Sequence, residues 1–235
     1  MKLLVFSKPA PSYRPFFNQC SDLVEEVKIV YPTQHPRRKE SQFQNFVNSC
    51  HQFAPDIIIS FYYNRIIQNE ILSFANLTVN FHGSLLPNYA GSHALNWQII
   101  NGEKVSGVTI HELTKAIDGG RIIAQDSFQI DFEDTARDVL KKGIRCSVDL
   151  LSFFVENYKS GMISMHEQTK SGHEFVCRKR TPEDGEITKE MTHLEAYNMI
   201  RALVDPWPGA FYYDNGNNKI ILNEYLSIEE VKRAL

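Results

Sequence analysis

The sequence predicts an α/β fold, in which a mostly parallel, twisted sheet with flanking helices is followed by a small C-terminal helix and a β-hairpin. Short β-prone runs in the first half alternate with helix-like stretches, and this alternation requires crossover connections between parallel strands. The run 56–61 (DIIISF) is almost continuously apolar, which is typical of a strand buried on both faces. The Asn215-Gly216 pair between two β-prone runs indicates a hairpin near the C-terminus.

The first half contains the parallel part of the predicted sheet. Apolar residues between 41 and 54 recur at helical spacing, whereas the remaining runs are short and β-prone. We expect strands at 2–7, 24–31, 56–61 and 77–82, helices at 41–54 and 92–101, a Pro-rich loop over 8–15 and a basic turn over 33–39.

The second half departs from this alternation. We expect strands at 106–113, 121–130 and 162–168, a long helix at 134–158, a helix at 194–203, and hairpin strands at 210–213 and 219–225. Asp134 or Thr135 would cap the long helix, since both residue types accept hydrogen bonds from a first helical turn. The composition shifts after Arg180, so we expect a main domain over 1–190 and a small appendage over 191–235.

Composition excludes several classes of protein. The 25 Lys and Arg against 28 Asp and Glu give a net charge of −3, which argues against a nucleic-acid partner. No apolar run approaches the roughly 18 residues that a membrane-spanning helix needs, so no membrane association is expected. The four cysteines are scattered without a C-x-x-C pair, which predicts no metal site, reduced thiols and a cytoplasmic protein.

Two short motifs carry polar groups suited to chemistry. Asn80 and His82 end the 77–82 strand on one face, at the edge where open α/β sheets bind ligands. An amide offers a donor to a developing oxyanion, and an imidazole titrates near neutral pH. Asp118 precedes a Gly-Gly pair that allows a tight turn. The alternatives are a structural histidine and an ordinary β-turn with a solvated aspartate.

The segment 79–87 (VNFHGSLLP) resembles the N-x-H…S-L-L-P signature of formyltransferases that use N10-formyltetrahydrofolate. The match continues through 95–103, 107–111 and 117–120 and is dense over roughly 56–130. The resemblance implies a Rossmann-like fold, with the catalytic domain over 1–190, and a catalytic triad. In that triad His82 acts as general base toward the acceptor amine, Asn80 stabilises the oxyanion, and Asp118 orients His82.

The resemblance also implies N10-formyltetrahydrofolate as cosubstrate, with no metal. The folate pocket would be walled by two segments, which consist of Asn64, Arg65, Ile66 and Ile67, and of Leu113, Thr114 and Lys115. Ordinary core packing is the alternative for the two isoleucines, and it does not exclude a role as pocket lining.

The acceptor is predicted from the positions at which this sequence differs from the patterns of particular formyltransferases. The segment 7–12 (SKPAPS) is not the Gly-rich loop of glycinamide ribonucleotide enzymes, and 88–91 (NYAG) lacks the arginines usual in methionyl-tRNA enzymes. From the length of 235 residues we expect neither the basic C-terminal domain of tRNA enzymes nor the N-terminal regulatory domain of formyltetrahydrofolate hydrolases. The stretch 201–211 resembles sugar-nucleotide formyltransferases, although tRNA enzymes share it.

We therefore expect formylation of a nucleotide-linked amino sugar, such as dTDP-4-amino-4,6-dideoxyglucose, in the synthesis of bacterial surface polysaccharide (O-antigen, lipopolysaccharide). Methionyl-tRNA and glycinamide ribonucleotide are the alternative acceptors. A non-catalytic module that binds folate or nucleotide is the alternative of another class.

Candidate contacts to this substrate follow from charge and position. Lys8 and Arg14 are cations suited to phosphate oxygens. Sugar or base contacts could come from Tyr89, His93, Asn96 and Trp97. Solvated cations and a core tryptophan are the alternatives. An apolar hairpin face of Phe211, Tyr213, Ile220 and Leu222 could form a homodimer surface or pack on its own domain.

Overall fold

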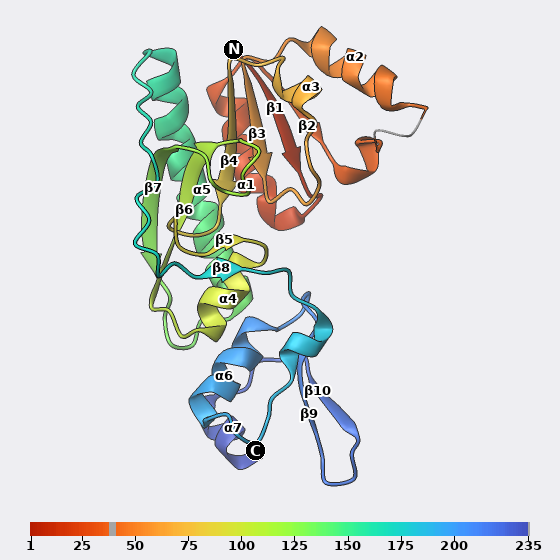
Figure 1. Ribbon diagram of the computed structural model, residues 1–235, viewed down its shortest axis with the longest axis vertical. Coiled ribbons are helices and arrows are strands. Elements are labelled where there is room, and N and C mark those ends of the chain that lie inside the picture. The colour runs from red at the N-terminus through yellow and green to blue at the C-terminus, as the bar shows by residue number, and fades with distance from the viewer. Residues whose placement is uncertain (38–40, 235) are drawn as a thin grey trace. The chain divides into compact units, whose positions relative to one another are not determined.

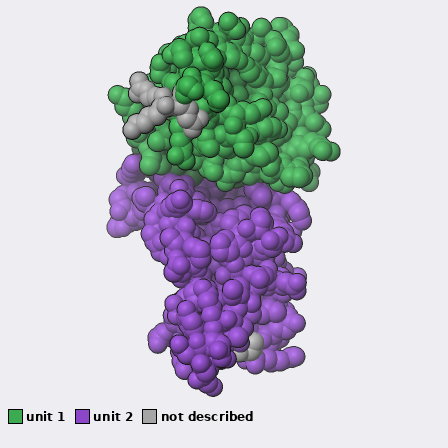
Figure 2. Space-filling model, turned by 90° about the vertical axis from the view of Figure 1, so that its right-hand side faces the viewer, with its two compact units in different colours: residues 1–82, 108–126, 144–169 green, residues 83–107, 127–143, 170–235 purple. Residues whose placement is uncertain are grey.

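The computed structural model describes residues 1–37 and 41–234. The chain forms two compact units, each assembled from separate segments (Figure 2). The first unit comprises 1–82, 108–126 and 144–169, and the second comprises 83–107, 127–143 and 170–235. The boundary at residue 190 stays a prediction.

A mostly parallel sheet with the strand order β2-β1-β3-β4-β6-β7 confirms the predicted fold class (Figure 1). Its strands are β1 (Lys2–Ser7), β2 (Glu26–Val30), β3 (Ile57–Phe61), β4 (Leu77–His82), β6 (Val105–Glu112) and β7 (Ile122–Gln129). Strands β2, β1, β3 and β4 are parallel, and β6 runs antiparallel to β4. All five residues of β3 are buried, as its continuous apolar run predicts.

Helices cover both faces of the sheet in the first unit. They are α1 (Arg14–Leu23) and α5 (Ala136–Lys159) on one face, and α2 (Phe43–Phe53) and α3 (Asn69–Leu72) on the other. Phe16 of α1 stacks on Phe61 with ring centroids 3.8 Å apart, and Gln19 donates to Ser152 of α5. On the opposite face, α2 buries Phe43 and Val47 against a cluster that includes Leu4, Phe6 and Ile58.

Two expectations along the chain need correction. Helix α1 replaces the end of the predicted loop, since Pro15 occupies the first turn, where a missing N–H costs nothing. The predicted strand 162–168 is wrong, because this segment makes only one isolated bridge, between His166 and Ile122. The basic turn 33–39 lies partly outside the described residues, and a short 3₁₀ helix (Pro32–Gln34) forms its beginning.

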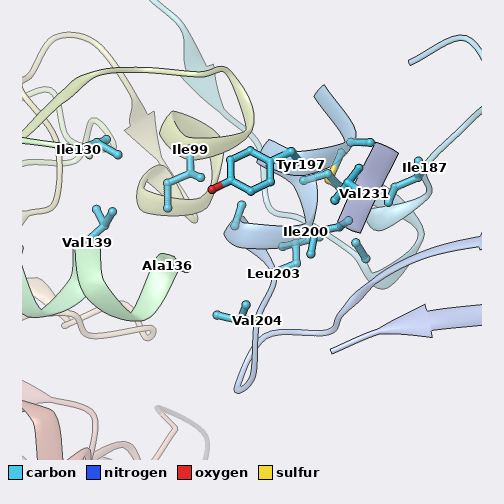
Figure 3. Close-up of a cluster of buried hydrophobic side chains, with 14 residues drawn as sticks. Ile99, Ile130, Ala136, Val139, Ile187, Tyr197, Ile200, Leu203, Val204 and Val231 are labelled. Atoms are coloured by element: carbon cyan, nitrogen blue, oxygen red, sulfur yellow. The ribbon is translucent and has the colours of Figure 1, made fainter. Parts of the chain in front are cut away.

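The second unit has its own apolar core, in which Tyr197 and Ile200 are fully buried (Figure 3). Its elements are β5 (Ala90–Gly91), α4 (Ala94–Ile100), β8 (Val176–Cys177), α6 (His193–Ala202), β9 (Ala210–Tyr213), β10 (Lys219–Leu222) and α7 (Ile228–Ala234). Helix α6 begins with a capping box, since Thr192 and Glu195 bond each other's backbone N–H groups. The predicted helix and hairpin near the C-terminus are both confirmed.

The apolar hairpin residues do not form the single face that we expected. In the antiparallel pairing, Phe211 lies opposite Ile221, whereas Ile220 lies opposite Tyr212 and Leu222 opposite Ala210. Directly opposite residues share a face, so the predicted set mixes both faces of the hairpin. Leu222 and Tyr212 pack against the core of the second unit. The hairpin therefore packs at least one face on its own unit.

Within residues 1–37 and 41–234, no helix is both long and apolar enough to cross a bilayer.

Candidate functional site

The two polar residues at the end of β4 lie on the sheet face that α2 and α3 cover. In the sheet register Asn80 is paired with Ser60 on one side and with His111 on the other. His82 is paired with Thr109 of β6. Because alternate residues of a strand share a face, Asn80, His82 and His111 all belong to this one face.

Asp118 lies beside both predicted catalytic residues. Its Oδ2 is 3.4 Å from Nδ1 of His82, and its Oδ1 accepts from Nδ2 of Asn80 at 3.4 Å. The structure therefore brings together Asn80, His82 and Asp118, which are separated in sequence. A carboxylate on Nδ1 favours the tautomer with the proton on Nδ1 and the lone pair on Nε2, and it stabilises a positive charge on the ring.

His111 is a fourth member of the cluster, to which the sequence analysis assigned no role. Its Nδ1 lies 2.8 Å from the backbone carbonyl oxygen of Glu112, to which it donates. Nε2 therefore holds a lone pair in the neutral ring and accepts from Asn80 Nδ2 at 3.1 Å. The His111 ring is 2% exposed. It fixes the orientation of the Asn80 amide.

The loop that carries Asp118 is closed at its base by Glu112 and Arg121. The Glu112 N–H donates to the Arg121 carbonyl oxygen, and the guanidinium makes a bidentate pair with the carboxylate at 2.6 and 2.8 Å. This pair lowers the pKa of Glu112. Gly120 lies so close to Glu112 that a Cβ there would be 2.0 Å from the Glu112 carbonyl oxygen. The loop closure therefore requires glycine at 120.

Gln168 holds the same loop from outside. Its side-chain amide donates to the carbonyl oxygens of Asp118, at 2.7 Å, and of Gly120, at 2.8 Å. Asp118 has a φ of 47°, a left-handed conformation that aspartate tolerates better than most residues. The two bonds from Gln168 stabilise this conformation.

The two predicted walls of the folate pocket lie over the face that carries Asn80. Ile67 and Leu113 both pack against the cluster that contains Leu4 and Ile58. The tips of the two loops are apolar and exposed, with Ile66 85% and Ile117 81% exposed. The remaining wall residues, Asn64, Arg65, Thr114 and Lys115, are exposed as well. The exposed side chains of Ile66 and Ile117 are therefore open to contact with a ligand.

Of the predicted substrate contacts, Lys8 and Arg14 lie exposed in the first unit, near the carboxyl end of β1. The other four belong to the second unit. Asn96 is 1% exposed and donates to the Ala202 carbonyl oxygen at 2.7 Å, which assigns it a structural role. Tyr89 is also buried, and its hydroxyl donates to Glu103.

His93 and Trp97 are more open than these two residues. His93 is exposed at the start of α4, and its Nδ1 accepts from the Arg180 N–H. Trp97 donates its indole N–H to the Arg178 carbonyl oxygen. The guanidinium groups of Arg178 and Arg180 lie 5.2 and 5.5 Å from the Trp97 ring centroid. Both cations lie over the tryptophan ring, and no motif in the sequence indicates either of them.

No group of three or more His, Cys, Asp and Glu that could hold a metal ion occurs among the described residues.

The model of the formyl transferase family matches residues 6–152, which include every member of the polar cluster. The chain belongs to the formyl transferase family. It is 37% identical over 224 residues to the bifunctional polymyxin resistance protein ArnA of Wigglesworthia glossinidia brevipalpis, covering 94% of the chain. The chain spans only about a third (33%) of the length of that relative.

Solved structures of other proteins share the fold. A 4-N formyltransferase from Francisella tularensis superposes with a TM-score of 0.75 at 19% identity, covering 96% of this chain and 98% of that one. HypX from Aquifex aeolicus in complex with tetrahydrofolic acid gives 0.74 at 21% identity, covering 91% of this chain and 36% of that one. These likenesses confirm the expected formyltransferase architecture.

Two residues of the site, His111 and Gln168, have no assigned role in the sequence analysis. Thr109 and His111 alternate on a predicted strand, so both side chains point to the same face. This face carries Asn80 and His82 only because β6 pairs with β4, and the sequence does not show that pairing. Gln168 lies in a segment with the pattern of a strand, and no feature of the neighbouring sequence indicates that its amide reaches the Asp118 loop.

Proposed function

We propose that this formyltransferase moves the formyl group of N10-formyltetrahydrofolate to the amine of a nucleotide-linked amino sugar. The observation that carries the chemistry is the convergence of Asn80, His82 and Asp118 on one sheet face. The acceptor amine would form a new bond to the formyl carbon, and the bond from that carbon to N10 would break. The proton released by the amine would pass through His82 to the departing N10.

The chain's own residues supply the base and the oxyanion donor. With Asp118 on Nδ1, Nε2 of His82 is the nitrogen for proton transfer. Asn80 Nδ2 has two N–H groups, directed at His111 and at Asp118. The bond to Asp118, at 3.4 Å, is the longer one, and we propose that it is exchanged for the oxyanion during reaction.

The exposed tips of loops 64–67 and 113–118 fit the folate. The benzoyl ring and the pyrimidine ring of the pterin present flat faces, against which the exposed aliphatic side chains of Ile66 and Ile117 would pack. A relative of this fold was solved with tetrahydrofolic acid, which supports folate as the donor framework here.

The proposed acceptor is supported by a similar solved structure and by the chemistry of the candidate residues. The Francisella tularensis protein is a 4-N formyltransferase, which supports an amine at a 4-position of the acceptor. We propose dTDP-4-amino-4,6-dideoxyglucose or a similar nucleotide sugar, used in the cytoplasm for surface polysaccharide such as O-antigen. Lys8 and Arg14 would bind the diphosphate, whereas contacts from His93 and Trp97 to the sugar or base stay predictions. A homodimer stays a prediction.

The test is a panel assay with the purified chain and N10-formyltetrahydrofolate. We expect turnover with a dTDP- or UDP-linked amino sugar, detected as a formylated product by mass spectrometry. Asn80→Ala should lower kcat by about 10²–10³, the usual effect of losing one oxyanion donor.

Other outcomes separate the alternatives. Turnover of methionyl-tRNA or glycinamide ribonucleotide, with no amino sugar used, would overturn the acceptor but keep the formyl transfer. Binding of tetrahydrofolate without turnover of any amine would favour a binding module.

A further inference from the structure

A buried histidine joins the two ends of one predicted wall of the folate pocket. His35, in the segment after β2, is 2% exposed. Its Nδ1 lies 2.6 Å from the hydroxyl of Tyr63, and its Nε2 lies 2.7 Å from Oε1 of Gln68. Tyr63 and Gln68 are the residues immediately before and after loop 64–67. One imidazole therefore closes this loop at both ends.

The two partners of His35 determine which of its ring nitrogens donates a hydrogen bond and which accepts one. Oε1 of Gln68 can only accept, so Nε2 of His35 carries the proton, and Nδ1 accepts from the Tyr63 hydroxyl. Burial raises the pKa of Tyr63 to about 12, which keeps that hydroxyl protonated as a donor. Arg65, inside the loop, donates to the His35 carbonyl oxygen at 2.5 Å and adds a third link.

Aromatic packing holds the imidazole in place. The ring stacks on Phe46 with centroids 5.0 Å apart and on Tyr63 at 5.9 Å, while Phe6 of β1 meets it at 5.4 Å in a tilted arrangement. Phe6 lies on the same sheet face as Asn80, since both are paired through Ser60 of β3. The histidine thus connects the loop to the rigid sheet that carries the catalytic cluster.

The loop needs such an anchor because of what it exposes. Ile67 is buried in the cluster on the sheet, whereas the neighbouring Ile66 is 85% exposed. A loop that presents an apolar side chain to water gains nothing from that side chain, so other contacts must hold its shape. The links through His35 supply these contacts.

We propose that His35 is a positioning residue for the folate donor, because it fixes loop 64–67 so that Ile66 meets the flat rings of the folate. This inference rests on the proposed function for the identity of the ligand. A preorganised loop binds its ligand without the cost of ordering, so loss of the links should weaken binding and leave the chemical step unchanged.

The variant His35→Phe removes both side-chain hydrogen bonds and keeps a ring in the aromatic stack. Tetrahydrofolate alone is the probe, titrated calorimetrically into wild type and variant, so no acceptor is needed. We expect its Kd to rise about tenfold, with a similar rise in KM for N10-formyltetrahydrofolate and kcat within about twofold of wild type. His51→Phe, the same change at an exposed histidine of α2, is the matched control and should leave Kd unchanged.

Two further measurements exclude a general loss of stability. Tyr63→Phe removes one link only; it should weaken tetrahydrofolate binding in wild type and change nothing further in the His35→Phe background. Amide hydrogen exchange in loop 64–67 should accelerate about tenfold in His35→Phe, while the strands β3 and β4 keep their protection.

The outcomes are distinct. If wild type binds tetrahydrofolate and His35→Phe binds it equally well, the positioning role is overturned. Unchanged exchange in loop 64–67 would overturn the link between His35 and the loop, whatever the ligand is. If wild type itself binds no tetrahydrofolate, the proposed function fails, and the role assigned here toward the donor falls with it.

Discussion

Nδ1 of His82 lies 3.4 Å from Oδ2 of Asp118, although His82 ends β4 and Asp118 lies in the loop between β6 and β7. The contact is long for a hydrogen bond, as is common for catalytic pairs in the absence of substrate. With Asp118 on Nδ1, the other ring nitrogen of His82 is the one left for proton transfer in the proposed reaction.

Asp118→Asn should therefore lower kcat by about a hundredfold or more with little change in fold, because an amide cannot stabilise the charged ring. Steady-state kinetics and a thermal melt would measure the two effects. Asp22→Asn, at an exposed position of α1, is the matched control. Wild-type kcat in Asp118→Asn would remove Asp118 from the mechanism.

Gln168→Leu should lower kcat about tenfold, because the Asp118 loop loses two donors to its carbonyl groups and the carboxylate drifts from His82. The KM for the donor should change less than kcat. Gln52→Leu, on the exposed side of α2, controls for the change of side chain. An equal loss of activity in both variants would argue against this positioning role.

Gly120→Ala should destabilise the protein by about 1–3 kcal/mol, because a Cβ would lie 2.0 Å from the Glu112 carbonyl oxygen and backbone must move. Urea denaturation measures this change. Gly172→Ala is the comparison, since nothing lies within 4 Å of its Cβ and only its φ of +88° opposes a side chain. A larger loss at 172 than at 120 would contradict the close approach.

The free energy of unfolding should fall as the pH drops below about 6.5, in part because of His35. Burial, reinforced by the charge of Arg65, lowers the pKa of His35 in the folded protein. The unfolded chain then binds more protons than the folded one between that lowered pKa and about 6.5, so stability rises with pH in this window. His35→Phe should reduce the slope, measured by denaturant titrations at several pH values. An unchanged slope would show that another group is responsible.

The local pattern predicted most of the elements that build the site. Strand β4 and its period-2 pair, Asn80 and His82, follow directly from alternation along a short apolar run. The resemblance to formyltransferases added Asp118, and the structure places it beside both residues. Asn96 shows the limit of such reasoning, because its position after the predicted catalytic loop suggests a substrate contact, whereas its amide is buried and donates to the Ala202 carbonyl oxygen.

The sequence by itself determined the class of fold, the strand that ends in Asn80 and His82, and the turn at Asp118, since these depend on periodicity and on backbone preferences of neighbouring residues. Tertiary structure alone decided that His111 orients Asn80, that Gln168 holds the Asp118 loop, and that His35 closes loop 64–67. Each of these contacts joins residues far apart in the chain. Strand pairing and loop closure set their distances, and no local pattern encodes either.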